Sequence, residues 1–263
     1  MASSVRLRTC LFICLTSAQA CGESPAPKAV AMLDSARTRI NPKAVVEPIL
    51  PIVLDTAGTR VLEFWPLAVT SARQIEETRR IVEHLQADLA LTEGFETATL
   101  LASGDGSMLL LVAAWRNQGA AETARASLAG WLRAEVDSGV RRRRLGTATS
   151  LVRVRRTVGT PPSLGDAAMM LFTRYALKPG HSFGALATLS DSNLAARVLR
   201  DTAAQGGATV AAADSGALYV IVQARTATAL DPRLQAAGPL PFWAPFADRE
   251  EQLLAVVAVV NHR

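Results

Sequence analysis

Residues 94–116 read GFETATLLASGDGSMLLLVAAWR. Two apolar runs flank a Ser-Gly-Asp-Gly-Ser stretch, a turn composition that predicts a β-hairpin between strands at 94–102 and 107–115. A strand with one face in solvent alternates apolar and polar residues, but every residue from Met108 to Ala114 is apolar. Both faces of this strand must therefore be covered by other parts of the protein.

The hairpin lies within a β-α-β-β-α-β order of elements. The pattern predicts a strand over 60–69, a helix over 71–91 that starts at Ser71, a second helix over 120–136 and a strand over 148–158. This order is that of a ferredoxin-like unit, in which both helices cover one face of a four-stranded antiparallel sheet.

The same order recurs after a linker at 159–166, with Gly106 and Gly216 at equivalent places in a repeat of roughly 110 residues. The predicted elements are a strand at 168–178, a helix within 182–203, a hairpin at 207–224, a weaker segment around 232–245 in place of the second helix, and a strand at 250–260. We therefore predict an α+β protein whose tandem ferredoxin-like repeats pack as an intramolecular, pseudo-dimeric α/β barrel.

The domain boundaries follow from this pattern. We expect a leader and linker over 1–57, a first repeat over 58–158 and a degenerate second repeat over 167–263. The leader has arginines, a short apolar stretch and Ala-Gln-Ala before Cys21, which is the order of a secretory signal. We expect a cytoplasmic protein, with export or lipid anchoring through the segment ending at Cys21 as the alternative, and a translation start at Met32 also open.

Composition limits the chemistry. All three cysteines lie in the first 21 residues, which excludes a disulfide framework or zinc–thiolate site in the folded body, and the three histidines are scattered. The net charge of +5 comes mostly from arginines at 141–156 with no interleaved aromatic residues, so we expect no nucleic-acid partner. No window approaches the roughly 18 apolar residues of a transmembrane helix, so we expect no stable membrane insertion.

Residues 93–117 resemble the central stretch of the antibiotic biosynthesis monooxygenase (ABM) family. That family typically has Gly-Phe at the start of the second strand, an Asp-Gly hairpin and a third strand ending in Trp; here these are Gly94, Phe95, Asp105, Gly106 and Trp115. The resemblance covers about residues 58–157 and survives in the second half only as topology. It implies an oxygenase without metal, flavin or haem, which uses O2 as co-substrate on an electron-rich aromatic such as a polyketide anthrone or phenol.

Such an enzyme must bind a flat ring system, stabilise its anion and exclude bulk water. We predict that Trp115, Arg116 and Asn117 form a catalytic corner of the pocket, with tryptophan as a stacking wall and the polar side chains as donors. Phe64 and Trp65 are expected to bind substrate, and Pro66 next to them indicates an edge or a bulge. Core packing is the alternative role for Trp115.

Three residues of the second half complete the predicted site. Arg174 lies in an apolar strand, where an arginine needs an anionic partner or solvent, and Tyr175 beside it could transfer protons. We expect both to be catalytic and His181 to contact substrate, although a loop histidine is more often simply exposed.

Two other functions fit the same fold. One is an aromatic polyketide cyclase, which needs acid–base groups but no oxygen, and the other is a non-catalytic ligand-binding or accessory protein. Similar barrels that degrade haem have a tryptophan early in the second helix and a histidine ligand near its end. Here the helix over 120–136 has Ala124 and Ala126 early and no histidine, so the resemblance disfavours haem degradation. The expected partner is a small aromatic substrate, and the chain is expected to be a monomer with an internal pseudo-dimer or a homodimer.

Overall fold

The computed structural model describes residues 51–134, 150–165, 169–200, 204–214, 216–224 and 243–262. The leader with Cys21 and Met32, on which the localisation predictions depend, lies outside this part of the chain. The strands are β1 (Val61–Ala68), β2 (Phe95–Ser103), β3 (Met108–Trp115), β4 (Ser150–Gly159), β5 (Met169–Leu177), β6 (Ala204–Ala212), β7 (Ala217–Ala224) and β8 (Ala247–Asn261). The helices are α2 (Gln74–Ala87), the short 3-10 turn η1 (Leu89–Leu91), α3 (Gln118–Ala134) and α4 (Phe183–Arg200).

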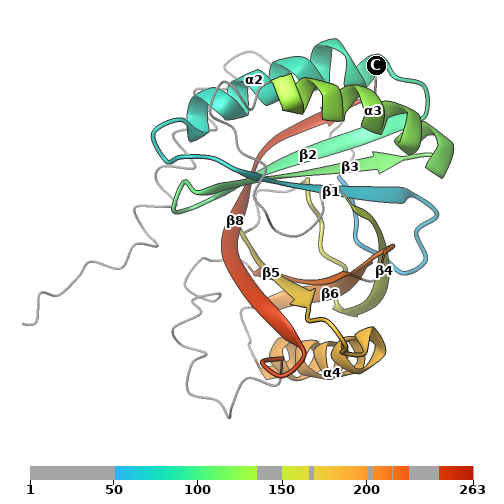
Figure 1. Cartoon of the computed structure of the whole chain (residues 1–263), viewed down its shortest axis with the longest axis vertical. Coiled ribbons are helices and arrows are strands. Elements are labelled where there is room, and N and C mark those ends of the chain that lie inside the picture. The colour runs from blue at the N-terminus through green and yellow to red at the C-terminus, as the bar shows by residue number, and fades with distance from the viewer. Residues whose placement is uncertain are drawn as a thin grey trace, which may run out of the picture.

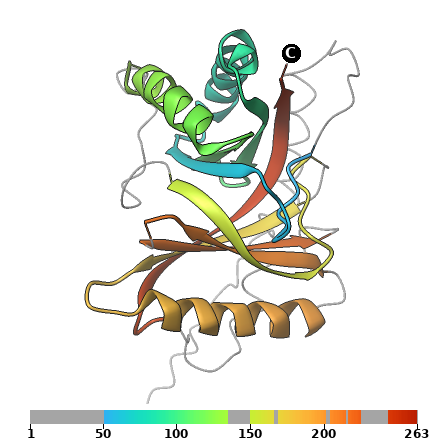
Figure 2. The ribbon, with the colours of Figure 1, turned by 90° about the vertical axis from the view of Figure 1, so that its right-hand side faces the viewer.

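These strands form one closed antiparallel barrel in the order β1-β3-β2-β8-β5-β7-β6-β4. The pairs β2–β8 and β4–β6 join the strands of the first half to those of the second. Helices α2 and α3 lie outside the barrel against β1, β2 and β3, while α4 lies on the opposite side (Figures 1 and 2). The predicted α+β barrel, with both faces of its strands covered, is confirmed.

The strand faces separate two apolar layers. In β3, Leu110 and Val112 point into the barrel, whereas Leu109 and Leu111 belong to the layer under the helices. Because side chains alternate along a strand, an all-apolar strand serves both layers at once. This explains why the sequence of β3 shows no alternation.

The hairpin turn also positions the first helix. Gly106 has a φ of +75°, and a Cβ at this position would lie 2.6 Å from the Cβ of Ser71, so glycine lets the turn and this segment approach each other. The prediction that the helix starts at Ser71 is wrong by about one turn: Ser71 lies against the hairpin turn and α2 begins at Gln74. The Gln74 amide donates hydrogen bonds to the carbonyls of Ser103 (3.0 Å) and Met108 (3.2 Å), which fixes this end of α2 to the hairpin.

The pairing of two strands, β1 and β8, bears on the sequence predictions. Among the residues that the structure describes, pairing of β1 with β4 ends at Phe64, before Pro66, whose missing N–H suits the end of such a pairing. Strand β8 is longer than the predicted 250–260, because residues 247–255 pair with β5 and residues 254–261 pair with β2. Most of the weak segment at 232–245 lies outside the described residues.

Candidate functional site

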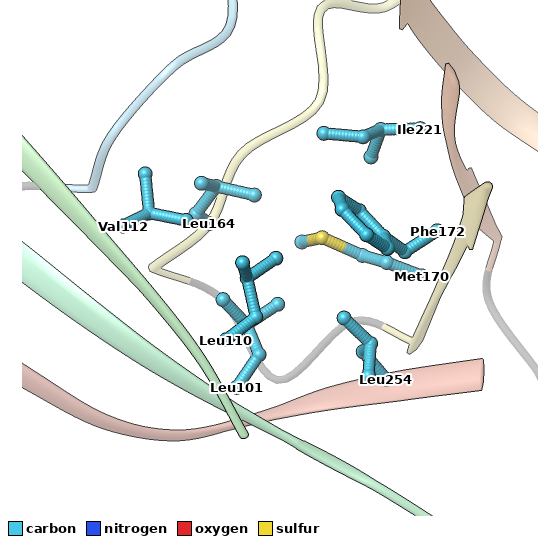
Figure 3. Close-up of a pocket in the computed structure, with 8 residues that line it drawn as sticks. All are labelled: Leu101, Leu110, Val112, Leu164, Met170, Phe172, Ile221 and Leu254. Carbon is cyan, nitrogen blue, oxygen red and sulfur yellow. The ribbon is translucent and has the colours of Figure 1, made fainter. Parts of the chain in front are cut away.

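The barrel interior is filled by side chains. Eight apolar residues from opposite sides of the barrel converge on one small cavity: Leu101, Leu110, Val112, Leu164, Met170, Phe172, Ile221 and Leu254 (Figure 3). Only about 10 Å³ of it admits the centre of a water-sized sphere, which is room for about one water molecule. A flat polycyclic ligand does not fit there.

The more informative feature lies on the other face of β1. Glu63 sits between Leu62 and Phe64, which both point into the barrel, so its own side chain points outward to the layer beneath the helices. The Glu63 side chain is 0% exposed. A carboxylate in an apolar layer is costly unless charged or hydrogen-bonding groups compensate it.

Arg125 of α3 supplies that compensation. Its Nε donates a hydrogen bond of 2.7 Å to Oε1 of Glu63, across 62 residues of sequence. Arg125 is 32% exposed, so its guanidinium stands between the buried carboxylate and solvent. The pair therefore links the first strand to the second helix.

Two tryptophans enclose the same carboxylate. Trp65 lies two residues along β1 from Glu63 on the same face, and Trp115 ends the neighbouring strand β3. Both are almost completely buried, and Trp115 packs edge-on against Phe95 with ring centres 5.5 Å apart. We call Glu63, Trp65, Trp115 and Arg125 the carboxylate cluster.

Polar atoms of the carboxylate cluster remain available for hydrogen bonding. Both indole N–H groups lie near enough to stabilise the Glu63 carboxylate. Even so, among the residues that the structure describes, Glu63 Oε2, Trp115 Nε1 and Arg125 Nη2 are buried without a partner in good hydrogen-bonding geometry. Buried polar atoms are normally satisfied, so three such atoms within this one cluster call for a ligand or a bound water.

The environment sets the acid–base character of this carboxylate. Burial raises the pKa of the Glu63 carboxyl above its ordinary value, while the Arg125 guanidinium and the two indole N–H groups oppose that rise. A carboxylate with a raised pKa accepts a proton more readily near neutral pH. The carboxylate cluster thus combines a proton acceptor, a guanidinium and two indole N–H donors, and aromatic surfaces.

The structure brings only part of the predicted first-half site together. Trp65 and Trp115 meet at Glu63, but Phe64 lies on the opposite face of β1, against the rings of Tyr219 (5.2 Å) and Phe172 (6.4 Å) inside the barrel.

The two polar residues that follow Trp115 point elsewhere. Arg116 is exposed, and Asn117 Oδ1 accepts a 2.9 Å hydrogen bond from the N–H of Ala120. The side chain of Asn117 therefore caps the start of α3. Its catalytic role and that of Arg116 stay predictions.

The predicted second-half residues lie on the other side of the barrel, away from α3. Arg174 is buried in the row of β5 that faces the barrel interior, whereas Tyr175 faces outward, 6.4 Å between ring centres from Trp243. Burial raises the pKa of Tyr175 to about 12, which disfavours its use as a base near neutral pH. His181 is exposed and contacts Phe246 edge-on. These residues do not join the carboxylate cluster.

Sequence reasoning missed Glu63 and Arg125. The signal for Glu63 was present, because it is a charged residue within an apolar strand, the same feature that drew attention to Arg174. Arg125 gave no such signal, since it lies on a helix with many small and polar neighbours. Only the fold shows that it reaches Glu63.

In the described ranges, no group of three or more His, Cys, Asp or Glu side chains could hold a metal ion. Over the same ranges no helix has the length and apolar character to span a membrane. The expectation of a cofactor-free protein stays a prediction.

No family model matches this sequence, and no curated protein matches it. Among solved structures, an anthrone oxidase-like protein is similar over 81% of this chain and 97% of its own, with a TM-score of 0.62 and 12% identity. This chain shares the barrel fold of that protein. A monooxygenase candidate from Fusobacterium nucleatum subsp. nucleatum covers 78% of this chain and 95% of its own, with a TM-score of 0.50 and 8% identity. The resemblance drawn from residues 93–117 is thereby confirmed for the fold, which is all that such low identities carry.

Proposed function

We propose that this protein is a cofactor-independent monooxygenase that uses O2 to oxidise an electron-rich aromatic compound of the anthrone or phenol type. The observation that carries the proposal is the carboxylate cluster: a buried Glu63 beside two indoles and a guanidinium. The likeness of the fold to an anthrone oxidase-like protein agrees with it. A polyketide-derived substrate is part of the proposal.

The chemistry needs few protein groups. Once an anthrone or phenol has lost a proton, its anion can transfer an electron to O2 directly. For an anthrone, the methylene carbon becomes a carbonyl, one oxygen atom of O2 enters the product and the other leaves as water. The protein holds the ring, stabilises the anion with fixed donors and keeps water away.

We further propose that the chain consists of two tandem ferredoxin-like repeats and that the first holds the working site. The registers of β1–β3 and β5–β7 support this comparison, since Val61 pairs with Trp115 as Met169 pairs with Ala224. By this register, the second-half counterparts of Glu63, Trp65 and Trp115 are Leu171, Thr173 and Ala224. At these three described positions the second repeat therefore has neither the carboxylate nor either indole, which supports placing the site in the first repeat.

The test is oxidation of anthrone under ¹⁸O2 by protein treated with a strong chelator. The proposal predicts an anthraquinone with one labelled oxygen, formed above the buffer rate and unaffected by the chelator. No product above the buffer rate, or loss of activity on chelation, would contradict it.

An aromatic polyketide cyclase is the second candidate, favoured by the acid–base character of Glu63. A cyclase would turn over equally well without oxygen, so the same reaction under nitrogen with a poly-β-keto substrate distinguishes the two.

A further inference from the structure

We propose that Glu63 is the catalytic base, and that the substrate presents a neutral hydroxyl which binds between Glu63 Oε2, Trp115 Nε1 and Arg125 Nη2. The substrate class rests on the proposed function, and the assignment of the base and its two donors goes beyond it.

The three atoms match the hydrogen-bonding capacity of one hydroxyl. A phenolic or enolic O–H donates one hydrogen bond, and its oxygen accepts others. The carboxylate cluster offers one acceptor, Glu63 Oε2, and two donors, Trp115 Nε1 and Arg125 Nη2, all buried without a partner in good geometry within the described chain. A hydroxyl placed among them would satisfy all three.

The charge of the site selects against anionic ligands. A carboxylate or phosphate would put a second negative charge beside Glu63, whose complete burial keeps bulk solvent from screening the repulsion. A ligand that arrives neutral and becomes negative by giving its proton to Glu63 avoids this repulsion. The total charge of the site is then unchanged by the reaction.

The proton transfer is simple to balance. The O–H bond of the substrate breaks, an O–H bond forms on Glu63 Oε2, and the electron pair stays on the substrate oxygen. Trp115 and Arg125 then donate hydrogen bonds to the resulting anion, which is the form of the substrate that reacts with O2. No oxidant takes part in this step.

Access to the site is expected from the side of α3. Arg125 is the one member of the carboxylate cluster with substantial solvent contact, since Glu63, Trp65 and Trp115 are each at most 2% exposed. We therefore expect the ligand to enter where the Arg125 side chain lies, while the two indoles stay fixed in the sheet.

The test uses 4-nitrophenol, whose neutral and anionic forms absorb at different wavelengths. The probe is titrated with protein at a pH where it is mostly neutral in solution, under nitrogen. Wild-type protein is expected to produce the nitrophenolate band on binding. Glu63→Gln is expected to abolish the band, whereas Glu83→Gln, which alters an exposed glutamate of α2, should leave it unchanged. Circular dichroism verifies that each variant is folded.

Each alternative result has a definite meaning. A band retained or strengthened in Glu63→Gln would overturn the proposal, because a carboxylate that only repels anions gives that result. Absence of binding to the wild type, or binding without the band, would also overturn it and leave a bound water as the partner of these atoms.

Trp115→Phe provides a second variant that keeps an aromatic ring at this position and removes the N–H donor together with part of the indole. It should weaken 4-nitrophenol binding about tenfold, the effect of losing one hydrogen bond to the developing anion. Unchanged affinity would contradict the placement of the hydroxyl.

The assay involves no oxidation, so the two proposals fail separately. A protein that forms nitrophenolate but consumes no O2 would retain Glu63 as a base and lose the oxygenase. A protein that oxidises anthrone without forming the band would retain the oxygenase and lose this assignment.

Discussion

Replacing Arg125 with methionine should destabilise this protein far more than removal of an ordinary surface cation. Arg125 lies 2.7 Å from a carboxylate that is 0% exposed, so its loss leaves a buried charge without compensation. Breaking such pairs costs about 3–5 kcal/mol. Because Arg125 itself keeps some solvent contact and Glu63 can take up a proton instead, we expect the lower end, about 3 kcal/mol at neutral pH.

The loss should depend on pH in a defined direction. The pKa of Glu63 is raised in the folded protein above its usual 4.5, so stability falls as the pH rises from 4.5 through the folded value. Without Arg125 that pKa rises further, so the difference between wild type and Arg125→Met should be small near pH 4.5 and largest above neutrality. Urea unfolding at several pH values measures it.

Two companion variants control the interpretation. Arg79→Met removes an exposed helical pair with Glu83 and should cost less than about 0.5 kcal/mol at any pH. Adding Glu63→Gln to Arg125→Met should recover more than half of the loss. A loss for Arg125→Met no larger than that for Arg79→Met, or one independent of pH, would refute the reasoning.

Three further predictions concern packing and ionisation. Trp115→Ala should destabilise the protein by about 3–5 kcal/mol and Trp115→Phe by only about 1 kcal/mol, as measured by thermal or urea unfolding. Gly180→Ala should cost about 1 kcal/mol for its positive φ alone, and Gly106→Ala at least about 1 kcal/mol more, because only there does the new Cβ meet another segment; equal losses would contradict the close approach. In a Tyr219→Phe protein, which leaves Tyr175 as the one tyrosine, ultraviolet titration should give a midpoint of about 12, and a midpoint near 10.0 would contradict its burial.

The elements around the hairpin could be predicted because their information is local. The apolar run from Met108 to Ala114, the turn glycine at 106 and the apolar spacing of the first helix each depend on near neighbours in sequence. Because a strand that is apolar at every position must be covered on both of its faces, the sequence also favoured a barrel. The length of β8 could not be predicted, because it reflects pairing with both β5 and β2.

The candidate site was predictable only in its aromatic part. Trp65 and Trp115 were identified by residue type and position, and they do meet at Glu63. The Glu63–Arg125 pair spans 62 residues and joins a strand to a helix, so no local pattern contains it. Arg116 and Asn117 directly follow Trp115, but the strand ends at Trp115, so their roles stay predictions.

The most direct test of the central claim is O2 uptake with anthrone by chelator-treated protein, comparing wild type, Glu63→Gln and Glu83→Gln. General-base catalysis contributes about 10²–10⁴-fold, so Glu63→Gln should lower the rate at least about 100-fold while Glu83→Gln matches the wild type. Equal rates in all three folded proteins would contradict the claim that the carboxylate cluster is the active site.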